Sequence, residues 1–547
     1  MKWELHQQYL SCFKDNQQTL LEYFDKEIAA FDFSGKEEHL EKEIDAYCNL
    51  YCKITAIHDF YNLSISIDNT NEEFRSLLQV SEKMISVLLN KRAFLVDFLR
   101  QTNHEVSSKY RGFINEIKRE SKYGSHILKA INTLSVTGGK AWRLFHITRL
   151  NQTQKDCGLS IAKLQSTVRN SNFNEATMAF NNINEVASRA AKDAIYALNN
   201  IKGEALSIAQ LLGYDTVLSY ELEKNRISRE MFDRYQKASS ELIPQAFYQL
   251  NKIINKQKYR LFELQRSEIA CSTSIEFDDM LTLLKNSLNK YSEEFVELID
   301  YYKNNSLIDN EPREGKRSGA CMAAVHELKK CFVLLNDTSG LRGFVSLAHE
   351  FGHVFHHTCM FKHPILETNS PMVINECVSK LFELMVLNSR NVVDAFSKEA
   401  IDELKLKGLI QTIGQVGARF KFEKAFFELR KTGPLSIEQT QQLMLESQVS
   451  SLENNLEEDG YASFEWVYMP HYYYTDISYY NYPYIIGYLT AILIYLRIEN
   501  GQLSFAKFTN VLVESGRLDS FSSFLKCLGI SEDIESELAK ITIDAIL

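Results

Sequence analysis

The chain has 547 residues, of which 45% are apolar and 24% charged, and a net charge of −10 at pH 7. This composition is ordinary for a globular protein and excludes a chain that is disordered throughout. The acidic balance argues against a broad surface for nucleic acid or anionic membranes, so we predict neither partner. With only 7 prolines and 22 glycines, long helices are favoured over a turn-rich β fold.

The N-terminal segment does not resemble a targeting sequence. Polar and charged residues interrupt residues 1–18 throughout, so the apolar centre of a secretory signal is missing. The longest apolar run, residues 484–496, has 13 residues, whereas a bilayer-spanning helix takes about 20. The ten cysteines show no paired spacing apart from Cys48 and Cys52. We therefore expect a cytoplasmic, reduced protein without membrane insertion, with specialised secretion as the alternative.

Residues 1 to about 310 show helical periodicity almost throughout. Apolar residues recur at spacings of three and four, as between Leu77 and Leu88. Polar residues near 170–174 and the region around Gly203 suggest a domain boundary between them. We therefore predict an N-terminal helical domain of residues 1–190 and a second domain of residues 191–547.

A short β-hairpin is predicted after residue 310. A charged loop of residues 311–319 precedes two short apolar runs, residues 320–325 and 331–335. Polar residues separate the runs, and residues 336–340 bound the second one, which is typical of paired strands. Helical periodicity resumes at Leu341. The expected fold is therefore mainly α, with one small β-sheet next to the helix that follows it.

An HExxH motif occupies residues 349–353 within a helical apolar pattern. On a helix, His349 and His353 lie one turn apart and project from the same face. Their imidazoles can meet one metal ion, and zinc is the ion that this motif typically binds. Glu350 lies about 100° further round the helix, where a general base can reach water at the metal. The motif predicts one zinc ion per chain, with Glu350 as the base.

Zinc requires a third protein ligand, for which Glu376 is the best candidate. It follows His353 by 23 residues, a gap that fits a turn and a second, antiparallel helix. Glu383 lies two turns further along the same face, where it can hydrogen-bond a ligand histidine from behind. His356 is also placed near the site, three residues after His353.

The surroundings of the motif strengthen the prediction, because HExxH alone also occurs by chance. Five of the chain's 13 histidines fall between residues 349 and 363. Cys359 and Cys377 are rival soft ligands, but a cysteine-ligated site would leave Glu376 unexplained. His357 and His363 are better explained as residues outside the metal site.

Further helices follow, and an aromatic segment interrupts them. Ser436 and Gln439 fit a capping box after the break at Gly433. Residues 471–488 hold one histidine and eight tyrosines. An aromatic core stripe explains most of these tyrosines. Phenols and an imidazole are also neutral donors that can stabilise a developing oxyanion, and we predict this role for a subset of the segment.

These segments resemble the thimet oligopeptidase and oligoendopeptidase F family of zinc metallopeptidases, and the oligoendopeptidase F branch most. The resemblance spans roughly residues 310–490, and the N-terminal third matches no motif. The matching positions are residues 314–320, residues 332–336, residues 347–356 including His356, Glu376, Glu383, His471, Tyr480, Tyr484 and Gly487.

The resemblance implies a multi-helix ellipsoid with a deep central channel and zinc at its floor. It implies that His349, His353 and Glu376 bind the zinc, with residues 191–547 as the metallopeptidase domain. Three further residues would hold the tetrahedral intermediate: His471, Tyr480 and Tyr484. The implied activity is an endopeptidase that cuts short unfolded oligopeptides by metal-activated water, with the peptide backbone added to an edge strand.

Two alternatives stay open. The chain could be a non-catalytic relative that only binds peptides, although the complete HExxH motif and Glu376 argue against this. It could also be a metalloprotease with one specific protein target. The oligomeric state is not predicted from the sequence.

Overall fold

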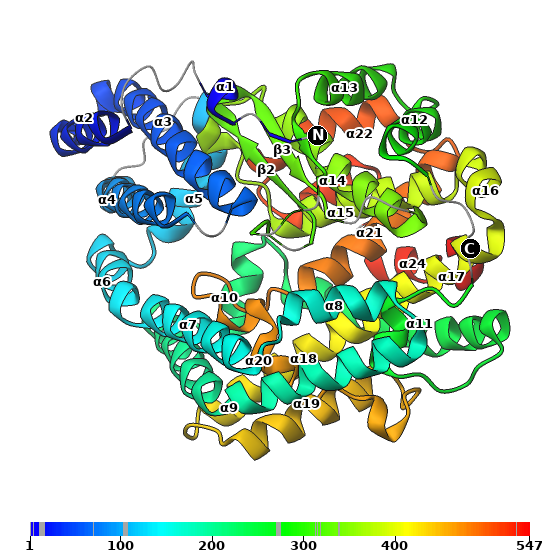
Figure 1. Ribbon diagram of the computed structural model, residues 1–547. Helices are drawn as coiled ribbons and strands as arrows, with labels where there is room; N and C mark the ends of the chain where they lie inside the picture. Colours follow the sequence, from blue (N-terminus) through cyan, green and yellow to red (C-terminus); the bar gives the residue numbers. More distant parts are fainter. Residues whose placement is uncertain are drawn as a thin grey trace. The chain divides into compact units, whose positions relative to one another are not determined.

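The computed structural model describes residues 2–3, 5–9, 17–68, 71–101, 108–269, 275–311, 313, 315–317, 319–336, 340–531 and 533–547. Over these residues the protein is mainly helical with one small sheet (Figure 1), which confirms the predicted fold class. Parts of the predicted loop 311–319 and of residues 336–340 lie outside the described residues. The ellipsoid and its channel stay predictions.

The chain divides into two compact units. Each unit combines segments that are far apart in the sequence. The first consists of Met1–Asn132, Ser274–Val392 and Asn500–Gly529, and the second of Thr133–Thr273, Val393–Glu499 and Ile530–Leu547. The predicted boundary near residue 190 falls inside a helix of the second unit, and the domain division stays a prediction. No helix among the described residues is long and apolar enough to cross a membrane.

The first unit carries the small sheet and the helices around it. The helix bounds in this unit are α1 Leu5–Gln8, α2 Gln17–Ala30, α3 Leu40–Ile67, α4 Glu72–Gln101, α5 Arg111–Glu120, α12 Phe277–Leu288, α13 Glu293–Asn304, α14 Gly340–Met360, α15 Met372–Leu387, α22 Phe505–Val513 and α23 Phe521–Cys527. Two helices, α6 Ser125–Thr137 and α16 Arg390–Phe396, lie where the chain passes between the units.

The predicted hairpin is confirmed. Strand β2 (Cys321–Val325) pairs antiparallel with β3 (Lys330–Leu334), with Cys321 opposite Leu334 and Val325 opposite Lys330. A short strand β1 (Ile308–Asp309) pairs parallel with β3, which gives the order β1-β3-β2. Two residues are too few to show the period-two alternation that reveals a strand, so β1 was missed. Among the described strands, β2 is therefore at an edge of the sheet.

In the described residues, the second unit consists of helices and loops, apart from one isolated β-bridge. Its helix bounds are α7 Gly139–Cys157, α8 Ile161–Asn170, α9 Phe173–Leu211, α10 Val217–Lys224, α11 Arg229–Ile254, α17 Lys398–Leu409, α18 Val416–Arg430, α19 Ile437–Ser451, α20 Glu465–Tyr468, α21 Tyr482–Glu499, α24 Ile534–Leu538 and α25 Ile543–Ile546. A π-helical turn, Ile410–Gln415, joins α17 to α18. The predicted capping box of Ser436 and Gln439 begins α19.

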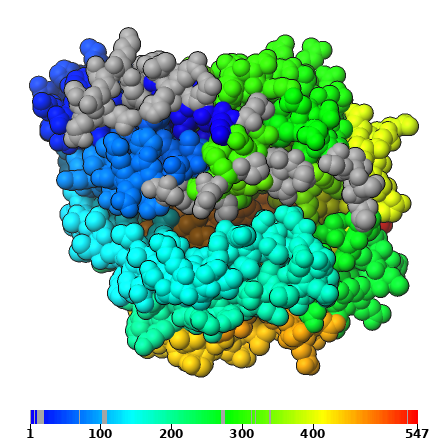
Figure 2. Space-filling view, viewed as in Figure 1, coloured from blue at the N-terminus to red at the C-terminus, as the bar shows by residue number. Residues whose placement is uncertain are grey.

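An alanine-rich face of α9 forms much of the core of this unit. The alanines at 187, 190, 191, 194 and 197 are buried, and they pack with large side chains that include Trp466, Tyr472 and Tyr473. Small side chains on a long helix let neighbouring elements approach closely. Helices α7 and α8 pack along α9 and form one continuous cyan surface in the space-filling view (Figure 2).

A buried histidine in this core should make stability depend on pH. His146 is 4% exposed and stacks on Tyr473 with 3.5 Å between ring centroids. Burial lowers the pKa of His146 from 6.5 to about 4. Between these two pKa values the unfolded chain binds a proton that the folded chain does not. The free energy of unfolding therefore decreases as the pH is lowered. From pH 7.5 to 5.0 the wild type should lose about 2 kcal/mol more than His146→Phe.

Urea unfolding of both proteins at the two pH values, followed by tryptophan fluorescence, would measure this difference. His126→Phe is the matched control, because His126 is exposed. It should keep the wild-type pH dependence. Equal losses in wild type and His146→Phe would show that His146 does not carry the effect.

Candidate metal centre

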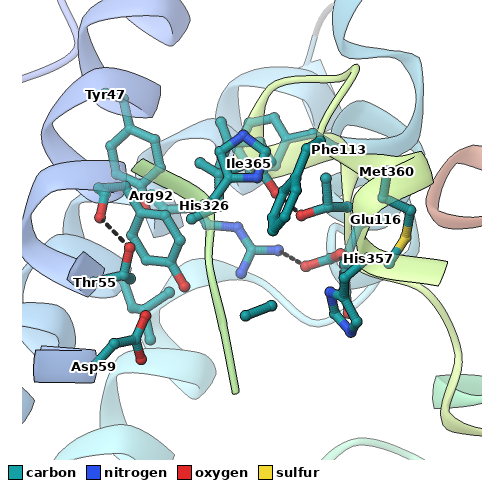
Figure 3. A pocket seen from close by; sticks show the side chains of 17 residues that line it. Tyr47, Thr55, Asp59, Arg92, Phe113, Glu116, His326, His357, Met360 and Ile365 are labelled. Carbon is teal, nitrogen blue, oxygen red and sulfur yellow. Dashed lines mark hydrogen bonds and ion pairs between the residues drawn. The ribbon is translucent and has the colours of Figure 1, made fainter. Parts of the chain in front are cut away.

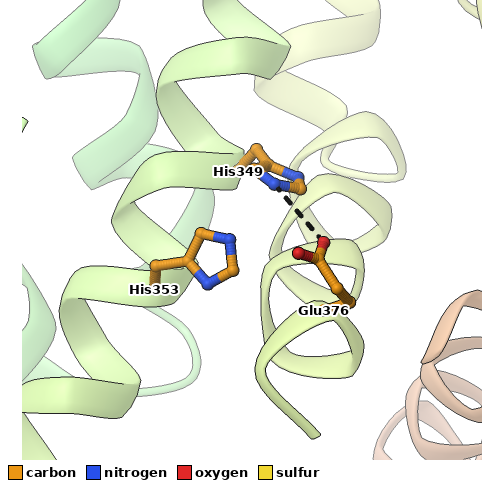
Figure 4. Close-up of side chains that lie close together, drawn as sticks. All are labelled: His349, His353 and Glu376. Atoms are coloured by element: carbon orange, nitrogen blue, oxygen red, sulfur yellow. Dashed lines mark ion pairs between the residues drawn. The ribbon is translucent and has the colours of Figure 1, made fainter. Parts of the chain in front are cut away.

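The described residues bring the three predicted metal ligands together. His349 and His353 on α14 and Glu376 on α15 each offer one ligand atom, and these atoms lie within 4.8 Å of one another. Figure 4 shows the two imidazoles leaving one helix and the carboxylate facing them from its neighbour. The His349 Nε2 atom lies 3.8 Å from Glu376 Oε2. Two imidazoles and one carboxylate form a donor set that suits a catalytic zinc ion and leaves a position open.

The ligands meet because α14 and α15 pack antiparallel at very short range. His349 contacts Glu383, and Gly352 packs against Ser379. Residue numbers therefore increase along α14 in the direction in which they decrease along α15. A Cβ atom on Gly352 would lie 2.6 Å from the Cα atom of Ser379. The glycine within HExxH thus permits the approach that brings Glu376 to the histidines. This confirms the predicted pair of antiparallel helices.

Glu383 fixes the orientation of the first histidine. The Nδ1 atom of His349 lies 2.6 Å from Glu383 Oε1. Because a carboxylate only accepts, Nδ1 carries the proton and Nε2 remains for a metal. Lys380 also contacts Glu383, at 2.9 Å. Burial raises the pKa of Glu383, but Lys380 and His349 outweigh it and hold this pKa at about 2.

Burial shifts the pKa values of both His353 and Glu350, the predicted general base. Burial lowers the pKa of His353 well below 6.5 and so favours the neutral imidazole that a metal ligand must be. Glu350 is 6% exposed, and its burial raises its pKa to about 7. His356 is fully buried, and its Nε2 lies 2.8 Å from the Ser515 hydroxyl. That contact holds α14 against the segment that follows α22.

Removing the charge of Glu383 should weaken the metal site. We expect Glu383→Gln to lower zinc affinity about 10- to 100-fold, since partners behind a ligand histidine contribute that much. Competition with a chromophoric chelator would measure the dissociation constant of the metal. Glu294→Gln, an exposed carboxylate on α13, is the control and should bind zinc as the wild type does. Unchanged affinity in Glu383→Gln would mean that the hydrogen bond does not support the ligand.

The predicted oxyanion donors form a cluster of their own in the second unit. His471 stacks on Tyr480 with 5.1 Å between ring centroids, and the hydroxyls of Tyr480 and Tyr484 lie 2.9 Å apart. Burial lowers the pKa of His471 to about 3, so its imidazole is neutral. Its Nε2 atom is buried without a hydrogen-bond partner among the described residues. Their placement relative to the metal ligands stays a prediction.

Two buried carboxylates, which the sequence did not reveal, hold the backbone of this aromatic segment. Glu423 accepts hydrogen bonds from the Tyr479 amide, at 3.1 Å, and from Lys202, at 2.6 Å. Glu221 accepts from the Ser478 amide at 3.0 Å. Tyr479 itself has a φ of 53°, a left-handed conformation that bulky residues rarely adopt. The carboxylates come from α10 and α18, far away in the sequence, so no local spacing could have identified them.

The fold and the His–His–Glu cluster built on HExxH define the class of helical metallopeptidases. Within that class, the chain belongs to Peptidase family M3, whose family model matches residues 174–542. This confirms the family that the motifs predicted.

Individual relatives agree with this assignment. The chain is 23% identical over 317 residues to the chromosomal oligoendopeptidase F of Lactococcus lactis subsp. cremoris, covering 54% of this chain and 50% of that protein. It is 24% identical over 315 residues to the group B oligopeptidase PepB of Streptococcus agalactiae, covering 55% and 51%. The matches thus span about half the length of these two relatives. The crystal structure of oligoendopeptidase-F from Enterococcus faecium shares the fold, with a TM-score of 0.66, 15% identity and coverage of 99% of this chain and 98% of that one.

Proposed function

We propose that this protein is a zinc-dependent endopeptidase that hydrolyses short unfolded oligopeptides. The observation that carries the proposal is the His349, His353 and Glu376 cluster, with the buried Glu350 on the same helix. Membership of Peptidase family M3 supports a peptidase, and the names of the two relatives support oligopeptides as its substrates.

In the proposed mechanism, His349, His353 and Glu376 hold the metal through the donor set described above. A bound zinc ion lowers the pKa of water and polarises a carbonyl. Glu350 accepts the proton of the water that attacks the scissile carbonyl and then passes it to the leaving amine. The raised pKa of Glu350 suits a group that takes and returns a proton near neutral pH.

We further propose that His471, Tyr480 and Tyr484 donate hydrogen bonds to the oxyanion of the tetrahedral intermediate. The neutral imidazole and the phenols are donors of the required kind. Their mutual stacking and hydrogen bonding hold them as one preorganised group. Peptide backbone would bind to the edge strand β2 by strand addition, which does not depend on peptide sequence.

The experiment is digestion of a peptide library, from very short to long members, with products read by mass spectrometry. We expect internal cleavage of short peptides, loss of cleavage after dialysis against a chelator, and recovery after zinc is added back. Cleavage that continues in metal-free protein would contradict the proposal. Zinc binding without cleavage of any library peptide would favour the peptide-binding alternative or a protease for a single protein.

A further inference from the structure

A cavity of about 400 Å³ lies within the first unit (Figure 3). Helices α3, α4 and α5 contribute to its wall, together with the end of β2, the end of α14 and the segment that follows α14. None of the three predicted metal ligands lines it. Its volume is in the range of small-ligand sites, about 300–1,000 Å³.

One stripe of α3 forms a continuous part of the wall. Tyr47, Tyr51, Thr55 and Asp59 follow one another at four-residue spacing and all line the cavity. Residues four apart on a helix lie on the same face. Tyr47 is only 1% exposed, and its hydroxyl oxygen has no hydrogen-bond partner among the described residues. The stripe therefore offers two aromatic rings, an unused hydroxyl and a carboxylate.

The carboxylate of Asp59 is not balanced by a positive charge. No described residue forms an ion pair with it, and Figure 3 shows it apart from the Arg92 guanidinium. Burial raises the pKa of Asp59 to about 7, and no neighbouring charge contributes to this shift. Such a carboxylate is strongly stabilised when a cation enters beside it.

Arg92 does not supply the missing charge, because it is already bound by two carboxylates. Its guanidinium lies 2.6 Å from Glu116 and 3.1 Å from Glu120. The imidazoles of His326 and His357 are neutral, since burial lowers the pKa of each to about 4. When Asp59 is ionised, the charged residues that line the cavity, Asp59, Arg92 and Glu116, sum to a charge of −1. Aromatic faces beside a carboxylate are typical of sites for ammonium and guanidinium groups.

The cavity and the HExxH motif share helix α14. Strand β2 packs against α14, the helix that carries Glu350. Ala324, near the end of β2, lines the cavity together with His357, near the end of α14. Three residues along a strand span about 10 Å at about 3.3 Å each. Seven residues along α14, from Glu350 to His357, also span about 10 Å.

We propose that this cavity is a subsite for a cationic group of the peptide substrate, with Asp59 as its counter-ion. The cation would be the side chain of Lys or Arg, or a free α-amino group, about three residues from the cut bond. The aliphatic stem of a basic side chain would pack on the rings of Tyr47 and Tyr51. This inference rests on the proposed function, and it adds a substrate preference that strand addition to β2 does not provide.

Matched peptides test the preference. Each peptide of an alanine-based series would carry one lysine, or one uncharged norleucine, at a single position up to four residues from the cut bond. We expect kcat/KM for lysine to exceed that for norleucine about tenfold at one position near the third residue. Acetylated and free N-termini, compared on peptides of graded length, separate an α-amino occupant from a side-chain occupant.

Two variants assign the effect to the cavity. In Asp59→Asn the lysine-to-norleucine ratio should fall to about one, whereas Asp59→Glu should keep most of it. Glu41→Gln removes an exposed charge from the same helix and should keep the wild-type ratio. A ratio near one at every position in the wild type, or a ratio that survives in Asp59→Asn, would overturn the proposal.

Binding separates this inference from the proposed function. Fluorescence anisotropy of labelled lysine and norleucine peptides would be measured on Glu350→Gln, with and without Asp59→Asn. Tighter binding of the lysine peptide that depends on Asp59 would support the subsite even if no peptide were ever cut. Equal binding of the two peptides would overturn the subsite even if cleavage were observed.

Discussion

Glu350→Gln should bind zinc like the wild type and lose at least about a hundredfold in kcat, the contribution typical of a general base. Glutamine keeps the size of the side chain but cannot accept the proton of the attacking water. Glu350 is not among the three residues whose ligand atoms cluster, so its replacement leaves the metal donor set intact. Metal content by atomic absorption and turnover of the best library peptide would be measured on the same preparation.

A control variant and the metal content of Glu350→Gln show whether the loss of activity is due to the missing base. Glu294→Gln changes an exposed carboxylate on α13 and should keep full activity and full metal content. If Glu350→Gln lost its metal, the loss of activity would report on the site and not on the base. If it retained metal and near wild-type turnover, the assignment of Glu350 as general base would be wrong.

The clustering of His349, His353 and Glu376 was predictable because its spacing rules are local. A spacing of four positions places His349 and His353 on one helix face, and the 23 positions from His353 to Glu376 leave room for one turn and one antiparallel helix. The contact of Lys380 with Glu383 also has helical spacing. An i, i+3 pair of opposite charges is common on exposed helix faces, so this spacing alone does not indicate a role at the site.

The substrate cavity could not be predicted in the same way. The spacing of Tyr47, Tyr51, Thr55 and Asp59 is visible in the sequence, but the same spacing describes any stripe of a helix that packs in a core. Whether the stripe lines a cavity depends on the opposite wall, which is formed by Ala324 and other residues more than 200 positions away. Long-range packing decides which side chains meet there. Glu221 and Glu423, the carboxylates that bind the backbone of the aromatic segment, could not be predicted for the same reason.

Replacing Gly352 should have a large structural effect, because this residue lies inside the HExxH motif and packs against the backbone of α15. An added Cβ atom would come within 2.6 Å of the Ser379 Cα atom and 3.2 Å of the Val378 carbonyl oxygen. Backbone atoms cannot rotate away, so α14 and α15 must separate. Ser379 lies between Glu376 and Glu383 on α15, so the shift would displace both the metal ligand and the carboxylate behind His349.

We therefore expect Gly352→Ala to lower the free energy of unfolding by about 1–3 kcal/mol, the usual cost of overpacking. Zinc affinity should also fall at least about tenfold, because ligand geometry sets affinity. Gly408→Ala is the matched control: Gly408 also lies in a helix, but nothing lies within 4 Å of its added Cβ atom. That variant should gain about 0.5–1 kcal/mol from helix propensity and bind zinc normally.

Thermal unfolding with and without zinc, together with chelator competition, would separate the two effects of Gly352→Ala. A variant that is only less stable would still gain as much stability from zinc as the wild type does, since that gain depends only on affinity and zinc concentration. A smaller gain would show that the distance between α14 and α15 sets the metal site. An unchanged zinc affinity would mean that the ligands tolerate the separation, and that the glycine is required for packing alone.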